Sequence, residues 1–287
     1  MKNKKFLILL IIGLGFFIYH TYFREIEGNI LVTEDYKTTT AYINDLYKSD
    51  EFFKKHLLSP EDYYIYEEML RASKERIFEL TIPCEGNDCK VKVERSFNAI
   101  YLDHPELLSY LGSATYYNGN INYSTYTNLG GLRLYLATER IERILDKIKK
   151  ETKDMSEQEK IIYVYDYVAS HNYDTLFSLT KENQTAYSFF TGGKSVCAGF
   201  AKAAQLIFQN IGINSMLVLT SDHMWNYVEY KGKYYVFDAT VGASLFKKDD
   251  YRFYNGLGET TIDKTTGLYK EYYPNISTTK LKDIFGL

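Results

Sequence analysis

The sequence predicts an α+β fold, and three features of its pattern predict it. A lysine-flanked apolar run at the N-terminus is typical of a membrane helix. Helical spacing and short strand-like pieces then mix up to about residue 150, which favours a small α+β lead domain. Beyond it, two helices precede three strands, which favours a helix packed on an antiparallel sheet. We therefore expect a signal anchor at residues 1–24, a lead domain with a helical connector at 25–150, and a domain that carries the chemistry at 151–287.

The composition fits a folded protein and excludes one class of partner. With 287 residues and 45% hydrophobic content, the chain can bury a sizeable core. A net charge of -3 and a pI near 6.0 leave no excess of basic residues to neutralise phosphates, so we expect no nucleic-acid partner. The 29 tyrosines could form a carbohydrate or peptide platform, but tyrosine also fills cores and half-buried strands, and we favour the second interpretation.

The N-terminal segment predicts an uncleaved signal anchor. Lys2, Lys4 and Lys5 precede an uncharged run that extends from Phe6 over about 18 residues to Phe23. No small-x-small cleavage site follows it. We therefore expect a single-pass membrane protein with the lysines in the cytoplasm and the remaining chain outside the cell. The alternatives are secretion after signal cleavage and a buried core helix, and the basic flank disfavours the core helix.

The three cysteines divide into a pair and a single thiol. Cys84 and Cys89 lie in a short polar segment, and in an oxidising compartment they are a plausible small-loop disulfide. No second Cys or His pair lies near them to complete four ligands, so we expect no metal site. That pairing leaves Cys197 alone, and an unpaired thiol in an exported protein needs a reason.

The lead domain is expected to begin with helices and to continue with strands. Residues 35–72 have the apolar spacing of one or two amphipathic helices. Residues 90–93, 114–117 and 132–136 predict short strands separated by Gly and Asn turns. Residues 140–150 predict a charged helix that connects the two domains.

In the second domain, capping and turn residues predict where the helices and strands begin and end. Ser156 and Glu159 form an S-x-x-E capping box, which predicts a helix that ends near residue 170. The next helix is expected to begin at about Cys197 and to end at Gly212. Three strands follow, the last two joined by a Lys231-Gly232 turn: residues 215–219, 225–230 and 233–238.

Cys197 has the position that a reactive thiol requires. At the first turn of a helix, free backbone N–H groups and the helix dipole favour the thiolate, and the Cys197 amide could hold an oxyanion. The nucleophile also needs a base and an orienting group, and His223 and Asp238 lie near strand ends further along the chain. A hairpin through the Lys231-Gly232 turn places these two roughly opposite one another. A buried structural role for the cysteine is the alternative.

Three motifs, in order, resemble the core of the transglutaminase-like (papain-like) superfamily: Ser195-Val196-Cys197-Ala198-Gly199-Phe200-Ala201, Asp222-His223-Met224-Trp225-Asn226, and Tyr235-Val236-Phe237-Asp238-Ala239-Thr240. Cys197 matches the nucleophile, His223 the base and Asp238 the third member. The resemblance covers residues 155–245 and implies a nucleophile helix packed on an antiparallel sheet. Asp103-His104-Pro105-Glu106 is similar to a segment that precedes this core in exported bacterial members.

The resemblance is weaker around the reacting groups. Met224 replaces the small residue often seen between His and Trp, and Ala239-Thr240-Val241 lacks the Pro or Trp common after the Asp. For a second oxyanion donor we predict Tyr187, with Gln184 as the alternative. Trp225 is expected to pack beside the site, where shielding the thiol or touching the substrate is the other interpretation.

The resemblance implies acyl transfer through a thioester on Cys197, without a cofactor. An amine acceptor would make the protein a transglutaminase, and water would make it an amidase or cysteine protease. The substrates expected for an anchored, extracytoplasmic enzyme are proteins or peptides of the cell envelope. The alternatives are a non-catalytic, membrane-anchored binding or scaffold module, and an interaction protein that acts through its tyrosine-rich lead domain.

Overall fold

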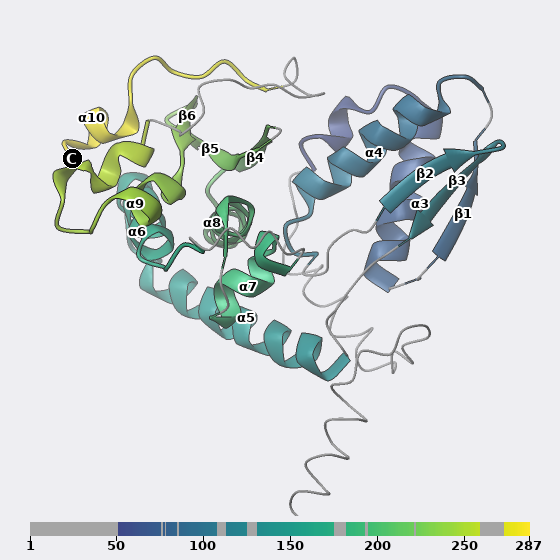
Figure 1. The fold of residues 1–287 in the computed structure, drawn as a ribbon. Helices are drawn as coiled ribbons and strands as arrows, with labels where there is room; N and C mark the ends of the chain where they lie inside the picture. The colour runs from purple at the N-terminus through teal and green to yellow at the C-terminus, as the bar shows by residue number, and fades with distance from the viewer. Residues whose placement is uncertain are drawn as a thin grey trace, which may run out of the picture.

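The computed structural model describes residues 51–75, 77, 79–84, 86–107, 113–124, 131–174, 182–192, 195–220, 222–258 and 273–287. The expected signal anchor at 1–24 and the start of the expected helical region at 35–72 lie outside these residues. Among the described residues, no helix has both the length and the apolar character needed to cross a bilayer. What the structure shows is a mixed α+β fold with two antiparallel sheets (Figure 1).

The N-terminal part, residues 51–124, consists of two helices packed on a three-stranded sheet of order β1-β3-β2 (Figure 1). Both strand pairs are antiparallel, and Ile121 in the central strand is fully buried. The elements are η2 (Lys54–His56), α3 (Pro60–Glu75), β1 (Glu79–Pro83), α4 (Cys89–Asp103), β2 (Ser113–Tyr117) and β3 (Asn120–Ser124).

Two of the three strands expected in this region are helical instead. Residues 90–93 lie in α4, where Cys89, Val93 and Ile100 are buried at helical spacing while Val91 is exposed. Residues 132–136 lie in α5 (Gly131–Glu151), whose buried side chains recur every three or four residues: Leu134, Ala137, Ile141, Leu145 and Ile148. In a segment of four or five residues, helical spacing of buried side chains cannot be told from the alternation of a strand. The period of three to four residues becomes visible only over the whole helix.

The structure joins Cys84, just after β1, to Cys89, at the start of α4, by a disulfide. Replacing both cysteines by alanine is expected to lower the free energy of unfolding by about 2 kcal/mol, because the bond restricts the unfolded chain over only a short loop. Chemical denaturation of the variant and the wild type measures the difference. A variant as stable as the wild type would contradict the expectation.

The C-terminal part contains the helices and strands that position the candidate site. Its sheet has the order β4-β5-β6, with both pairs antiparallel. The elements are α6 (Glu157–Ala169), η3 (Glu182–Gln184), α7 (Ala186–Thr191), α8 (Cys197–Ile211), β4 (Ser215–Leu219), β5 (Met224–Tyr230), β6 (Lys233–Phe237), α9 (Ala239–Leu245), η4 (Tyr251–Gly256) and α10 (Leu281–Phe285).

Local sequence signals account for most of these boundaries. Ser156 and Glu159 form the capping box that begins α6. Helix α8 starts at Cys197 and ends at Gly212, which takes a left-handed conformation with φ of 73°. The turn between β5 and β6 has positive φ at both Lys231 and Gly232, as a two-residue hairpin requires.

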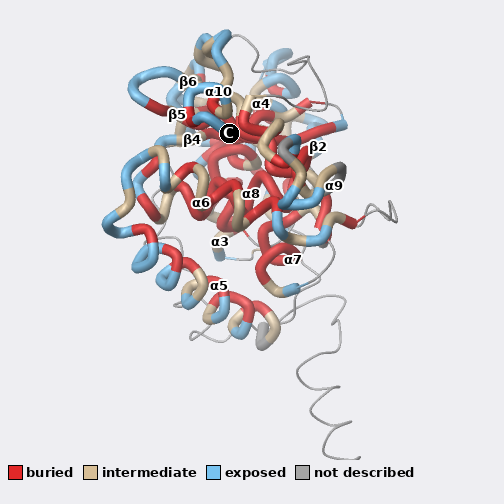
Figure 2. Tube along the Cα trace, turned by 90° about the vertical axis from the view of Figure 1, so that its left-hand side faces the viewer, coloured by how far each residue is buried: buried red, intermediate tan, exposed pale blue. Residues whose placement is uncertain are grey.

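Helix α8 lies at the centre of the molecule, between the C-terminal sheet and helices α5, α6 and α7 (Figures 1 and 2). One side of α8 faces an apolar cluster with α5 and α6. On the other side, Ala198 and Ala201 share a cluster with α3, α4 and the N-terminal sheet. An apolar cluster therefore runs across the predicted boundary at residue 150, and the division into two domains there stays a prediction.

Candidate active site

Cys197 is the first residue of α8, so its thiol lies at the positive end of the helix dipole. The preceding residue, Val196, is extended and its amide donates to the carbonyl oxygen of Asn183 at 3.1 Å. Gly199 allows the loop to pack against the first turn, because a Cβ there would lie 1.9 Å from Ser195 Oγ. The loop and the glycine together hold the thiol at the helix end.

His223 and Asp238 complete a constellation around this thiol. His223 Nε2 lies 2.8 Å from Asp238 Oδ2, and both side chains are buried. The thiol of Cys197 is hydrogen-bonded to the His223 ring, and since Nε2 is engaged by the carboxylate, Nδ1 is the nitrogen left for it. The structure therefore brings together the three residues that the motifs single out.

The strand register differs by two residues from the one expected. Tyr230 pairs with Lys233 across the turn, and the same register, extended, would place Trp225 opposite Asp238. His223 therefore reaches the carboxylate diagonally. The contact forms because the chain leaves β6 after residue 237 and begins α9 with Asp238 as its N-cap.

Asp238 is fixed by contacts that the sequence motif does not reveal. Its Oδ1 accepts hydrogen bonds from the Thr240 amide, at 3.1 Å, and from the Thr240 hydroxyl. Its own amide donates to the carbonyl oxygen of Gly256 at 2.8 Å. A Cβ on Gly256 would lie 2.0 Å from the Asp238 carbonyl oxygen, so only glycine fits this approach. The carboxylate that orients His223 is thus held by both α9 and η4.

The site favours a thiolate paired with an imidazolium. Burial raises the pKa of Cys197, but the hydrogen bond and charge of His223, together with the N–H groups of Met224 and Ala198, bring the pKa below its ordinary value. Burial likewise lowers the pKa of His223, but its hydrogen bonds and Coulomb attraction to Asp238 and Cys197 raise the pKa to about 9. The protonated His223 ring therefore stabilises the thiolate of Cys197, which is the nucleophilic form of the sulfur.

Tyr173 is the residue at the thiol that the sequence reasoning missed. The Cys197 amide donates to the Tyr173 hydroxyl at 3.3 Å, and the hydroxyl is also hydrogen-bonded to the thiol. Burial, followed by the charge of Cys197, raises the pKa of Tyr173 to about 12, so the hydroxyl stays protonated. The hydroxyl is therefore the group that accepts from the Cys197 amide, which was expected to hold an oxyanion.

Tyr187, the expected second oxyanion donor, contacts α5. It is buried in α7, where its hydroxyl accepts a hydrogen bond from Arg133 Nη2 at 3.0 Å. Trp225 does lie at the site. Its ring stacks on His223 with centroids 5.5 Å apart and planes at 23°, and its buried Nε1 has no hydrogen-bond partner among the residues that the structure describes. The indole thus shields one face of the imidazole from water.

No signal in the motifs pointed to Tyr173, Thr240 or Gly256 as parts of the site. An isolated parallel bridge between Tyr173 and Ser195 brings Tyr173 to the segment just before Cys197. In the part of the chain that the structure describes, no group of His, Cys, Asp and Glu side chains could hold a metal ion.

Comparison with known proteins points to one superfamily. Residues 142–239, which include Cys197, His223 and Asp238, match the family model of the Transglutaminase-like superfamily. No curated protein matches the chain. A crystal structure of a TGase aligns with 15% sequence identity and a TM-score of 0.32, over 69% of this chain and 56% of that one.

Proposed function

We propose, from the premise that residues 142–239 form a transglutaminase-like domain, that the chain is a cysteine-dependent acyltransferase or hydrolase that acts on protein or peptide amides. One observation carries the proposal: the His223 ring joins the thiol at the start of α8 to the buried carboxylate of Asp238. The nucleophile is thus hydrogen-bonded to the base, and the base to the orienting group, as acyl transfer by a cysteine requires.

The reaction proceeds in two halves. Cys197 Sγ attacks the carbonyl carbon of the amide, and His223 gives its proton to the departing amine as the C–N bond breaks. This leaves a thioester on Cys197. His223, now neutral, then takes a proton from an amine or a water molecule as that acceptor attacks the thioester. The C–S bond breaks, and the thiolate of Cys197 is restored beside the protonated His223. Asp238 keeps the ring oriented throughout.

The cell surface is the proposed site of action. The lysine-flanked apolar run at residues 1–24 supports a single-pass anchor with the catalytic part outside the cell. The disulfide between Cys84 and Cys89 supports an oxidising compartment. Envelope proteins or peptides are the proposed substrates, because they are within reach of an anchored enzyme.

The proposal is tested by the rate of Cys197 alkylation with iodoacetamide as a function of pH in the full-length protein. Cys197 is the thiol left free by the disulfide, so labelling reports on it alone. Fast labelling near and below neutral pH is expected, and His223→Ala should slow it by about tenfold or more at pH 6, since each pKa unit of the thiol changes the thiolate fraction tenfold.

Equal and slow labelling of the wild type and His223→Ala would overturn the catalytic proposal. It would favour the non-catalytic scaffold instead. If the thiol is activated, amine incorporation measured against release of free acid from an envelope extract decides between a transglutaminase and a hydrolase.

A further inference from the structure

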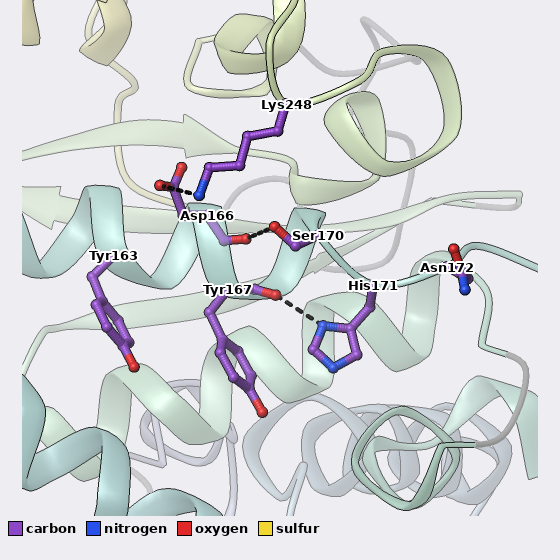
Figure 3. A pocket seen from close by; sticks show the side chains of 7 residues that line it. All are labelled: Tyr163, Asp166, Tyr167, Ser170, His171, Asn172 and Lys248. Carbon is purple, nitrogen blue, oxygen red and sulfur yellow. Dashed lines mark hydrogen bonds and ion pairs between the residues drawn. The ribbon is translucent and has the colours of Figure 1, made fainter.

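A groove along α6 lies outside the Cys197–His223–Asp238 constellation. It has a volume of about 570 Å³, within the usual range of small-molecule sites. Figure 3 shows its lining: side chains of α6, the loop that follows α6 at residues 170–172, and Lys248 from the loop after α9. None of these side chains takes part in the acyl-transfer steps above.

One wall of this groove, here called the α6 groove, is made of rings. Tyr163 and Tyr167 are four residues apart and project from the same face of α6, and His171 continues the row just beyond the end of the helix. The two tyrosine rings are nearly parallel, with planes at 6° and centroids 6.5 Å apart, and His171 lies 5.1 Å beyond Tyr167. A row of rigid rings offers flat apolar surface at a small entropy cost.

The charges in the α6 groove are compensated within the protein. Asp166 Oδ2 forms an ion pair with Lys248 Nζ at 3.0 Å. The Tyr163 hydroxyl donates to Glu151 Oε2 at 2.5 Å. Burial lowers the pKa of His171, which keeps this ring neutral. The two charged side chains that line the groove, Asp166 and Lys248, are therefore paired with each other.

Neutral hydrogen-bonding groups remain free along the α6 groove. His171 Nδ1 donates to the Tyr167 carbonyl oxygen at 2.8 Å, so Nε2 is left as an acceptor. The Tyr167 hydroxyl and the amide of Asn172, an exposed residue, have no partner among the described residues. Together they offer both donors and acceptors without charge.

We propose that the α6 groove binds a saccharide chain. Sugar rings present flat C–H faces that match the tyrosine row, and their hydroxyl groups both donate and accept, as the free groups of the groove require. A charged peptide would leave its own charges without partners here, because Asp166 and Lys248 already neutralise each other.

One end of the groove adjoins in the chain a residue that contacts Cys197, which suggests what the saccharide is attached to. This part of the inference rests on the proposed function. Asn172, at one end of the groove, is followed directly by Tyr173, whose hydroxyl contacts the Cys197 amide. A glycan held along α6 would bring an amide attached to it towards Cys197. The substrate class is then a glycan-linked peptide or protein.

The test is calorimetric titration of the full-length Cys197→Ala protein, in a detergent without a sugar headgroup. The probes are a β-1,4-linked N-acetylglucosamine tetramer, a glucose tetramer and an uncharged peptide of similar length. At least one saccharide is expected to bind. Tyr163→Ala and, at an exposed position that leaves folding intact, Asn172→Ala are each expected to weaken that binding by about five- to tenfold.

Tyr117→Ala is the matched control, because this tyrosine is 69% exposed in β2 and lies away from the groove. It should leave saccharide binding unchanged. The proposal would be overturned if neither saccharide binds or if the peptide binds instead. It would also be overturned if the saccharide binds equally to the protein with the wild-type groove and to both groove variants. Since the protein titrated has no thiol at position 197, these results are independent of the alkylation test of the proposed function.

Discussion

Replacing Asp238 by alanine is expected to lower the pKa of His223 from about 9 and to slow Cys197 alkylation at pH 6 by at least about tenfold. Burial lowers the pKa of His223, and the Asp238 carboxylate is the first group that opposes this effect. Without it the ring becomes neutral at a lower pH. The thiolate then loses its positive partner, so the pKa of Cys197 rises.

NMR titration of the ring signals of His223, assigned with His223→Ala, measures the first effect, and iodoacetamide labelling measures the second. Asp222→Ala is the control, because it removes an exposed carboxylate beside His223 in the sequence and leaves the bond to Asp238 intact. Equal effects of the two substitutions would show that net charge, and not the His223–Asp238 bond, sets the reactivity of the thiol.

Replacing Gly256 by alanine is expected to destabilise the folded protein by about 3 kcal/mol and to slow Cys197 alkylation. The new Cβ would lie 2.0 Å from the Asp238 carbonyl oxygen and 2.6 Å from the Tyr165 hydroxyl, a buried group. Backbone atoms cannot yield as a flexible side chain does, so η4 or Asp238 has to move. Either shift changes the distance between Asp238 and His223.

Thermal and chemical denaturation, together with the labelling rate of the protein that remains folded, measure both effects. Gly232→Ala serves as the control, since it places a Cβ at a positive φ with no atom within 4 Å. It should cost only about 1 kcal/mol and leave labelling unchanged. If the Gly256→Ala protein has the stability and reactivity of the wild type, the close packing of η4 on Asp238 is not required for folding or for activation of the thiol.

The parts of the site that local sequence signals determine could be predicted. Cys197 was expected at a helix start because an apolar face and Gly212 mark that helix, and the strands of the hairpin follow from alternation around Lys231-Gly232. The α+β class and the likeness to the transglutaminase-like core are confirmed for the residues matched.

What could not be predicted depends on contacts between distant segments. Tyr173 reaches Cys197 from 24 positions away, and Gly256 supports Asp238 from a turn with no motif of its own. Tyr187 bonds through its hydroxyl to Arg133 of α5, and its role as an oxyanion donor stays a prediction. The register error at Asp238 arose because the onset of α9 turns the carboxylate out of the strand.

The apolar cluster that α8 shares with the N-terminal part bears on how the molecule unfolds. Ala198 and Ala201 of the nucleophile helix pack in the same cluster as Met69 of α3 and Ile100 of α4. Opening the N-terminal part would expose the side of the helix that carries these two alanines. Residues 51–124 and the helix of Cys197 should therefore denature in one cooperative transition.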